Sequence, residues 1–396
     1  MNCSFCNTKN TKILKDFAFL PRCFDFQKKS NNQNGLYRIV QFQCKKCGVI
    51  QLKKNGKPQT FKPKYKWVSN NEPQEHLSKL SGYIEKFLKK GKRILFLSKY
   101  DQLLFNIAKK KYNKSIYQLD SYNDLKIKDR NTNQFFIQEQ LIKKNLNKLK
   151  KKIGSFDLIV SCRVLEHSYD IFKLIKNLKK LLNRNGEFIF EVPDSYKSLK
   201  QGDIGMLWEE HPVYLTKNSI RLGFKNLGLK ISKIFTYNYP QENALAVHLV
   251  QQKKIRIYKN EISSELKLGS EFVRKIKIIK KKIENNIIKY NKGERNIVLF
   301  GAGHRSIFFI NALNLSKHFS HIVDDNKKKI GLYFPSTDLK IKSSKSLLNK
   351  KIKLCLLSLN IKIENKIVKK LKKLNNKLVF YSISPDSKIA LPSFKN

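Results

Sequence analysis

The chain has 396 residues, 41% of them hydrophobic, which predicts two or three domains with packed cores and excludes a wholly disordered chain. No apolar run reaches the ~18 residues of a membrane-spanning helix, and the N-terminal sequence MNCSFCNTKN lacks the basic-then-apolar layout of a secretion signal. We therefore expect a cytoplasmic protein with no membrane partner. The 82 Lys and Arg residues outnumber the 30 Asp and Glu residues, so the formal net charge is +52.

This excess of positive charge raises the question of a nucleic-acid partner. The basic residues are mostly lysine, are spread over the whole chain and occur with many Asn and Ile, as an A+T-rich genome would produce. Specific recognition of bases relies on arginine. We therefore interpret the charge as a solvated lysine coat and expect no specific nucleic-acid partner. A zinc-ribbon protein that binds nucleic acid remains a less favoured alternative.

The first predicted domain, residues 1–62, contains two CxxC pairs. Residues 36–43 alternate apolar and polar side chains, as a half-buried strand does, and lead directly into the second pair. Gly48, immediately after that pair, suits a tight turn that needs positive φ. The four cysteines, Cys3, Cys6, Cys44 and Cys47, have the spacing of a closed thiolate cage for structural Zn²⁺. A lost or redox-active site is the alternative, and we expect Cys23 to be a core thiol.

The second predicted domain, residues 63–252, alternates strands with helices. Strands are predicted at 93–97, 115–120, 156–161 and 187–193, and helices at 103–111 and 171–182. Asp170 is placed to cap the second helix, and Asn185-Gly186 to turn the chain after it. This alternation predicts a mostly parallel sheet with helices on both faces. Since such sheets bind ligands beyond the carboxyl ends of their strands, residues 98–102, Asp120, 161–167 and 193–195 should surround one crevice.

The third predicted domain, residues 253–396, begins with a long helix whose apolar side chains recur at steps of three and four up to Tyr290. Strands follow at 296–300, 321–324, 354–359 and 378–381, which predicts a second, smaller α/β unit. Gly301-Ala302-Gly303 follows the first of these strands, and Ser306 takes the place of the third glycine of a dinucleotide-binding loop. Contact with a nucleotide and a plain tight turn both remain open for this loop.

Motifs in all three domains occur in a distinctive order. They are Cys44–Leu52 (CKKCGVIQL), Phe156–Val160 with Val164–His167 (VLEH), Glu191–Asp194 (EVPD), Glu210-His211 with Tyr214, Gly301–Gly303 followed by Asp325, Asn326, Gly331 and Pro335, and Leu357–Asn360 (LSLN). Together they resemble the motifs of the three-domain sugar C-methyltransferases that use S-adenosylmethionine (SAM). The resemblance implies an N-terminal zinc ribbon, a central class I methyltransferase domain of Rossmann-like α/β fold and a small C-terminal nucleotide-fold-like α/β domain.

The resemblance also implies a reaction. Such enzymes remove a proton from a carbon next to a ketone in a nucleotide-linked keto-sugar, and the enolate carbon then takes the methyl group of SAM. His211 matches the proposed base, Glu210 would orient the base or a sugar hydroxyl, and His167 lies at the same crevice. Asp120 would bind the ribose of SAM. Ser98, Asp101 and Cys162 are the other expected contacts of the cofactor.

The chain departs from the family pattern in the first loop of the central domain. Ser98 and Gln102 replace two glycines, and Phe96 replaces the acidic residue of the strand. Glycine in this loop lets the backbone approach the methionine part of SAM. Trp208 stands where a tyrosine is expected. Two interpretations follow, an active SAM-dependent methyltransferase with a remodelled loop and a catalytically silent homologue that serves as a binding or scaffold module.

Overall fold

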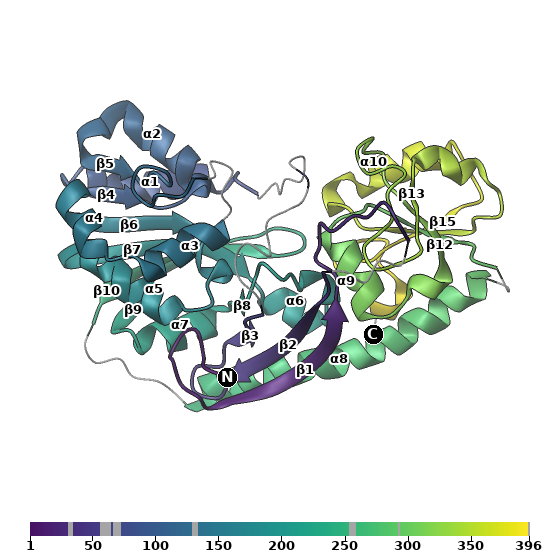
Figure 1. Ribbon diagram of the computed structural model, residues 1–396, viewed down its shortest axis with the longest axis horizontal. Helices are drawn as coiled ribbons and strands as arrows, with labels where there is room; N and C mark the ends of the chain where they lie inside the picture. The colour runs from purple at the N-terminus through teal and green to yellow at the C-terminus, as the bar shows by residue number, and fades with distance from the viewer. Residues whose placement is uncertain are drawn as a thin grey trace.

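The computed structural model describes residues 1–30, 35–55, 65, 73–128, 134–252, 259–291 and 294–394, and contains three β-sheets (Figure 1). Their strand orders are β1-β2-β3-β8, β5-β4-β6-β7-β10-β9 and β13-β12-β11-β14-β15. The chain therefore folds into the two α/β units that the sequence predicts, preceded by a small antiparallel sheet. Among the described residues, no helix combines the length and the apolar character needed to cross a membrane.

The N-terminal sheet is antiparallel and consists of β1 (Thr11–Leu20), β2 (Tyr37–Cys44), β3 (Ile50–Leu52) and β8 (Val213–Tyr214). The strand expected at 36–43 is confirmed as β2. The fourth strand, β8, was not expected, because it comes from the middle of the chain and pairs with β3. The first domain is therefore joined to the second by backbone hydrogen bonds.

The central sheet has four parallel strands, β5 (Ile116–Gln118), β4 (Ile94–Phe96), β6 (Phe156–Cys162) and β7 (Leu182–Asp194), followed by antiparallel β10 (Asn243–Gln251) and β9 (Leu229–Tyr237). Its helices are α1 (Leu77–Leu88), α2 (Gln102–Tyr112), α3 (Gln134–Lys143), α4 (Leu146–Ile153), α5 (Ile171–Leu178), α6 (Tyr196–Gln201) and α7 (Lys217–Lys225). Alternate strand residues enter two separate cores. Leu95 and Ile159 pack under α3, α4 and α5, whereas Ile94 and Leu158 pack under α1 and α2. The predicted sheet with helices on both faces is confirmed.

Two details of the central sheet differ from the expectation. The helix expected to end near residue 182 ends at Leu178, although Asp170 caps it as expected by accepting a hydrogen bond from the Lys173 amide (2.9 Å). The turn expected at Asn185-Gly186 is not formed, because β7 already begins at Leu182 and includes both residues. The pairing of β7 with β6 shifts register between Phe156 and Leu158, so the extra residues of β7 form a bulge.

The C-terminal unit is a parallel sheet of β13 (Ile341–Lys342), β12 (Phe319–Val323), β11 (Ile297–Phe300), β14 (Leu354–Leu357) and β15 (Val379–Ser382), with α9 (His304–Ala312) and α10 (Ile361–Lys372). It is preceded by the long helix α8 (Lys259–Asn291). The predicted apolar stripe of α8 is buried from Phe272 to Ile287. Since α8 packs against β1, α6 and α7 as well as β11, it runs along all three parts of the molecule (Figure 1).

Candidate active site and metal centre

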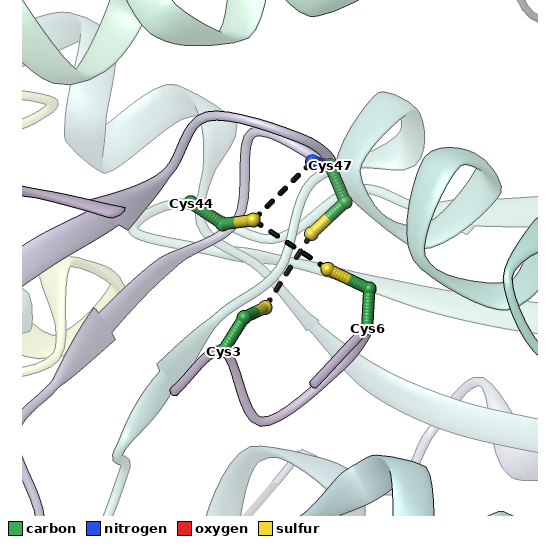
Figure 2. A group of neighbouring side chains, drawn as sticks. All are labelled: Cys3, Cys6, Cys44 and Cys47. Carbon is green, nitrogen blue, oxygen red and sulfur yellow. Dashed lines mark hydrogen bonds between the residues drawn. The ribbon is translucent and has the colours of Figure 1, made fainter. Parts of the chain in front are cut away.

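The two CxxC pairs come together as the sequence predicts (Figure 2). The Sγ atoms of Cys3 and Cys47 are 3.6 Å apart, and those of Cys6 and Cys44 are also 3.6 Å apart. A tetrahedron with Zn–S bonds of ~2.3 Å has edges of ~3.8 Å, so four thiolates with this spacing fit Zn²⁺. All four cysteines are buried and none forms a disulfide.

The surrounding backbone also suits a bound cation. The amides of Lys46 and Cys47 donate to Cys44 Sγ (3.3 and 3.4 Å), which favours a thiolate at that position. Gly48 has φ +75°, and a Cβ there would meet the Glu265 side chain at 2.4 Å, so glycine serves both the turn and the contact with α8. The four-cysteine cluster is thus suited to a structural zinc ion.

The loop after β4 is braced by the side chains that sequence reasoning assigned to the cofactor. The Asp101 carboxylate, fully buried, accepts hydrogen bonds from the amides of Leu97 (2.8 Å), Ser98 (2.6 Å) and Cys162 (2.6 Å). The Ser98 hydroxyl donates to the Cys162 carbonyl (2.9 Å). Ser98, Asp101 and Cys162 therefore lie together at the carboxyl ends of β4 and β6, and these bonds hold the loop itself. Burial raises the pKa of Asp101 to about 7.

Asp120 lies apart from this group, at the carboxyl end of β5. Its Oδ1 accepts hydrogen bonds from the amides of Tyr122 (2.8 Å) and Asn123 (2.7 Å), which form the turn expected there and lower the pKa of the carboxyl. The side chain is exposed. A carboxylate accessible beyond the end of the second parallel strand can accept hydrogen bonds from the ribose hydroxyls of SAM, so Asp120 is compatible with this cofactor.

His211 lies in the segment between the 3₁₀ helix at Ile204–Met206 and β8, within a group of aromatic rings. The centroid of its ring is 4.7 Å from that of His167 and 4.5 Å from that of Trp208. Trp208 in turn stacks on His304 at 5.2 Å. The His211–His167 proximity places the two predicted catalytic histidines side by side.

Burial controls protonation in this group. It lowers the pKa of His167 to about 3, and it lowers the pKa of His211 well below the usual range, helped by the positive charge of nearby Arg163. Burial also raises the pKa of Glu210 well above its usual range, with a further contribution from Glu209. At neutral pH both imidazoles are therefore neutral.

A cavity of about 740 Å³ opens beside His211, between the central and C-terminal units. The central unit contributes Arg163, Trp208 and His211 to its wall, and the C-terminal unit contributes His304, Arg305 and Lys362. Glu210 does not line the cavity. A cavity of this size with several cationic side chains can take an anionic small molecule.

Arg163, His304 and Arg305 were not named as candidate residues from the sequence, although the segment 161–167 was expected at the crevice. Arg163, buried and with φ +54°, is held by an ion pair with Glu191 (3.1 Å), which also contacts His76 (3.2 Å). A left-handed non-glycine residue at a strand end is typical of functional sites, but φ cannot be read from a sequence. His304 and Arg305 directly follow the Gly301–Gly303 loop, which was the available signal. Arg305 bridges the two units by an ion pair with Asp203 (2.7 Å).

The Gly301–Gly303 loop itself is a tight turn. Gly301 has φ +104°, and a Cβ there would lie 2.4 Å from the Ser358 carbonyl oxygen. The Ala302 amide donates to the Asp324 carboxylate (2.9 Å), which also pairs with Lys329 (3.0 Å). The turn brings His304 and Arg305 to the cavity.

Comparison with known families agrees with this arrangement. Residues 70–234 match the methyltransferase domain, and residues 246–381 match the C-methyltransferase C-terminal domain. None of the curated proteins matches the chain.

Several solved structures are similar to part of the chain. Magnesium protoporphyrin IX methyltransferase from Synechocystis PCC 6803 has 12% identity and a TM-score of 0.27, covering 46% of this chain and 90% of its own. A SAM-dependent methyltransferase from Aquifex aeolicus has 14% identity and a TM-score of 0.27, covering 46% and 100%. The N-methyltransferase NodS from Bradyrhizobium japonicum has 11% identity and a TM-score of 0.27, covering 46% and 99%.

The sheet with helices on both faces and the two family matches define an α/β protein with a class I methyltransferase fold. The chain is a methyltransferase by its domains. Its C-terminal part matches the C-methyltransferase C-terminal domain, and this part supplies one side of the cavity that His211 also lines.

Proposed function

We propose that the protein is a SAM-dependent C-methyltransferase that acts on a nucleotide-linked keto-sugar held in the cavity between the central and C-terminal units. The observation that carries this proposal is the shared wall of the cavity, which is lined by His211 of one unit and by His304 and Arg305 of the other. An acceptor that is larger than a single sugar, and anionic, would use both walls. The C-terminal unit would then bind the acceptor as well as support the fold.

His211 is the proposed base. Its imidazole is neutral at pH 7 because burial lowers its pKa, and it lines the cavity. A neutral imidazole within reach of a carbon next to a ketone can remove the proton. His167, whose ring lies 4.7 Å from that of His211, limits the positions that the His211 ring can take, and Glu210 remains the proposed orienting group.

The resulting enolate needs a positive partner. Arg163 lines the same cavity, and its pairing with buried Glu191 fixes the direction of the guanidinium. Fixed donors directed at developing negative charge contribute more than flexible ones, since they need no reorganisation. Arg163 is therefore the proposed partner of the ketone oxygen. Arg305 and Lys362 are the proposed partners of the phosphates of the nucleotide handle, which stays attached to the sugar throughout the reaction.

The methyl group would come from SAM, which supplies it on a sulfonium centre when bound. Asp120 would hold the ribose, and the backbone of residues 97–99 would face the rest of the cofactor. Ser98, Asp101 and Cys162 would act through the shape of this loop, because their side-chain and backbone polar groups already bond to one another.

Two measurements test this proposal. Calorimetric titration of the purified protein with SAM should give saturable binding that Asp120→Ala weakens. Incubation of nucleoside diphosphate keto-hexoses in D₂O should then show exchange of the proton next to the ketone with the wild-type protein and none with His211→Ala. An absence of both binding and exchange would refute the assignment, while exchange at an undiminished rate in His211→Ala would remove His211 as the base.

A further inference from the structure

The segment that carries His211 has one side at the cavity and the other side against the N-terminal domain. Trp208 and His211 line the cavity, whereas Glu209, between them, does not. Glu209 is 3% exposed and extends into the N-terminal domain, where it meets Cys23. A buried carboxylate beside the proposed base, but outside the cavity, calls for a role other than contact with substrate.

Both oxygens of Glu209 accept a hydrogen bond from Cys23, and the Tyr37 side chain also interacts with this carboxylate. The Cys23 amide donates to Oε1 (2.7 Å), and the Cys23 thiol donates to Oε2 (2.9 Å). Burial raises the pKa of the thiol well above its usual range, so Cys23 keeps the proton that it donates. The next residue, Phe24, packs edge-on against Trp208 with ring centroids 6.2 Å apart. Two consecutive residues of the N-terminal domain therefore contact two consecutive residues of the His211 segment.

The other end of the segment is attached to the same domain. The Leu52 amide donates to the Pro212 carbonyl (2.8 Å), and β8 then pairs with β3. Gln51 of β3 accepts from the Ser4 amide (2.7 Å) and donates to Cys3 Sγ (3.4 Å) of the metal cluster. The proposed base thus lies between two attachments, one at Cys23 and one at the strand next to the four cysteines.

We propose that Glu209 is a positioning residue, which fixes the His211 segment to the N-terminal domain through the amide and thiol of Cys23. This proposal rests on the proposed function, since it assigns Glu209 to the placement of the base. In Glu209→Gln an NH2 group replaces one of the two carboxylate oxygens, so only one of the two Cys23 donors keeps a buried acceptor and the segment is held less tightly to the domain. A shift of about 1 Å in a catalytic group can lower a rate on the order of 100-fold.

Trp208 allows the attachment to be measured without a substrate. The chain has two tryptophans, and Trp67→Phe leaves Trp208 as the only one. Acrylamide quenching of Trp208 fluorescence should rise by about twofold or more in Glu209→Gln and Cys23→Ala, because the segment gains mobility. Cys23→Ser keeps a hydroxyl donor and should restore the parent value. The matched control is Glu364→Gln, which removes an equally buried carboxylate that accepts from Ser382 and Ser387 in the C-terminal unit.

The same variants are then assayed for methyl transfer to a nucleoside diphosphate keto-hexose. We expect kcat to fall about 10- to 100-fold in Glu209→Gln with KM within about twofold of the parent. The proposal would be overturned if quenching and kcat stay at the parent value in Glu209→Gln and Cys23→Ala. It would also be overturned if both quantities change equally in Glu364→Gln. If the parent itself transfers no methyl group, the proposed function fails, and the quenching series still decides whether Glu209 holds the segment.

Discussion

Asp101 offers the sharpest quantitative test of the loop after β4. Its pKa of about 7 exceeds the ordinary aspartate value of 3.8 because the carboxyl is fully buried. The folded protein therefore holds this proton more tightly than the unfolded chain does. As the pH rises from about 4 to 7, the unfolded chain loses the proton first, so folding stability decreases over this window and becomes constant above it.

The size of the effect follows from the shift. At 1.36 kcal/mol per pKa unit, a shift of about 3 units corresponds to ~4 kcal/mol in total, of which ~3 kcal/mol falls between pH 5 and pH 8. Asp101→Asn removes the titrating group. Urea unfolding at pH 5 and pH 8 should therefore show that the wild type loses ~3 kcal/mol more than the variant between these two pH values.

Asp16→Asn is the control, because Asp16 is a carboxyl near the surface whose pKa is lowered by Arg38. Its removal should change the pH dependence slightly and in the opposite direction. Equal pH dependence in the wild type and Asp101→Asn would refute the reasoning, since the buried carboxyl would then titrate as it does in the unfolded chain.

Three further predictions concern the proposed reaction and the metal. His211→Ala should abolish methyl transfer and leave the calorimetric affinity for SAM nearly unchanged; activity equal to the wild type removes His211 from the mechanism. Since burial lowers the pKa of His211, the base stays neutral in mild acid, so a pH–rate profile of kcat should show no loss as the pH falls from 7.5 to about 6; a decline centred near pH 6.5 contradicts this. Metal analysis should find about one zinc per wild-type chain, and Cys44→Ser should lose the metal and lower the thermal midpoint; wild-type protein without zinc contradicts the cage.

Much of the fold could be predicted because its signals are local. The strands at Ile94–Phe96 and Phe156–Cys162 are short apolar runs, and the stripe from Phe272 to Ile287 has helical spacing. The CxxC spacing likewise predicted that the four cysteines form one cluster, and they do so in the structure. The pairing of β8 with β3 had no such signal, because it joins residues more than 160 positions apart and depends on tertiary packing.

The candidate site was predictable only in part. His167 and His211 were chosen from motifs, and they do lie side by side. Arg163, His304 and Arg305 were missed because their importance comes from the cavity between two units. Ser98 and Asp101 were expected to contact a cofactor. In the structure their polar side-chain atoms bind amides of their own loop and the backbone of Cys162 at the end of β6. Whether a side chain faces a ligand or its own backbone is set by φ, ψ and packing. The spacing of residues along the sequence does not reveal these.

The central claim is that the protein forms a bond between a carbon of the acceptor and the methyl group of SAM. The most direct measurement is carbon-13 NMR of the products after incubation of the protein with SAM labelled at its methyl carbon and a set of nucleoside diphosphate keto-hexoses. We predict a labelled methyl group coupled to a neighbouring sugar carbon that has lost its proton. A label found on oxygen or nitrogen, or left entirely on SAM with every acceptor, would contradict the claim.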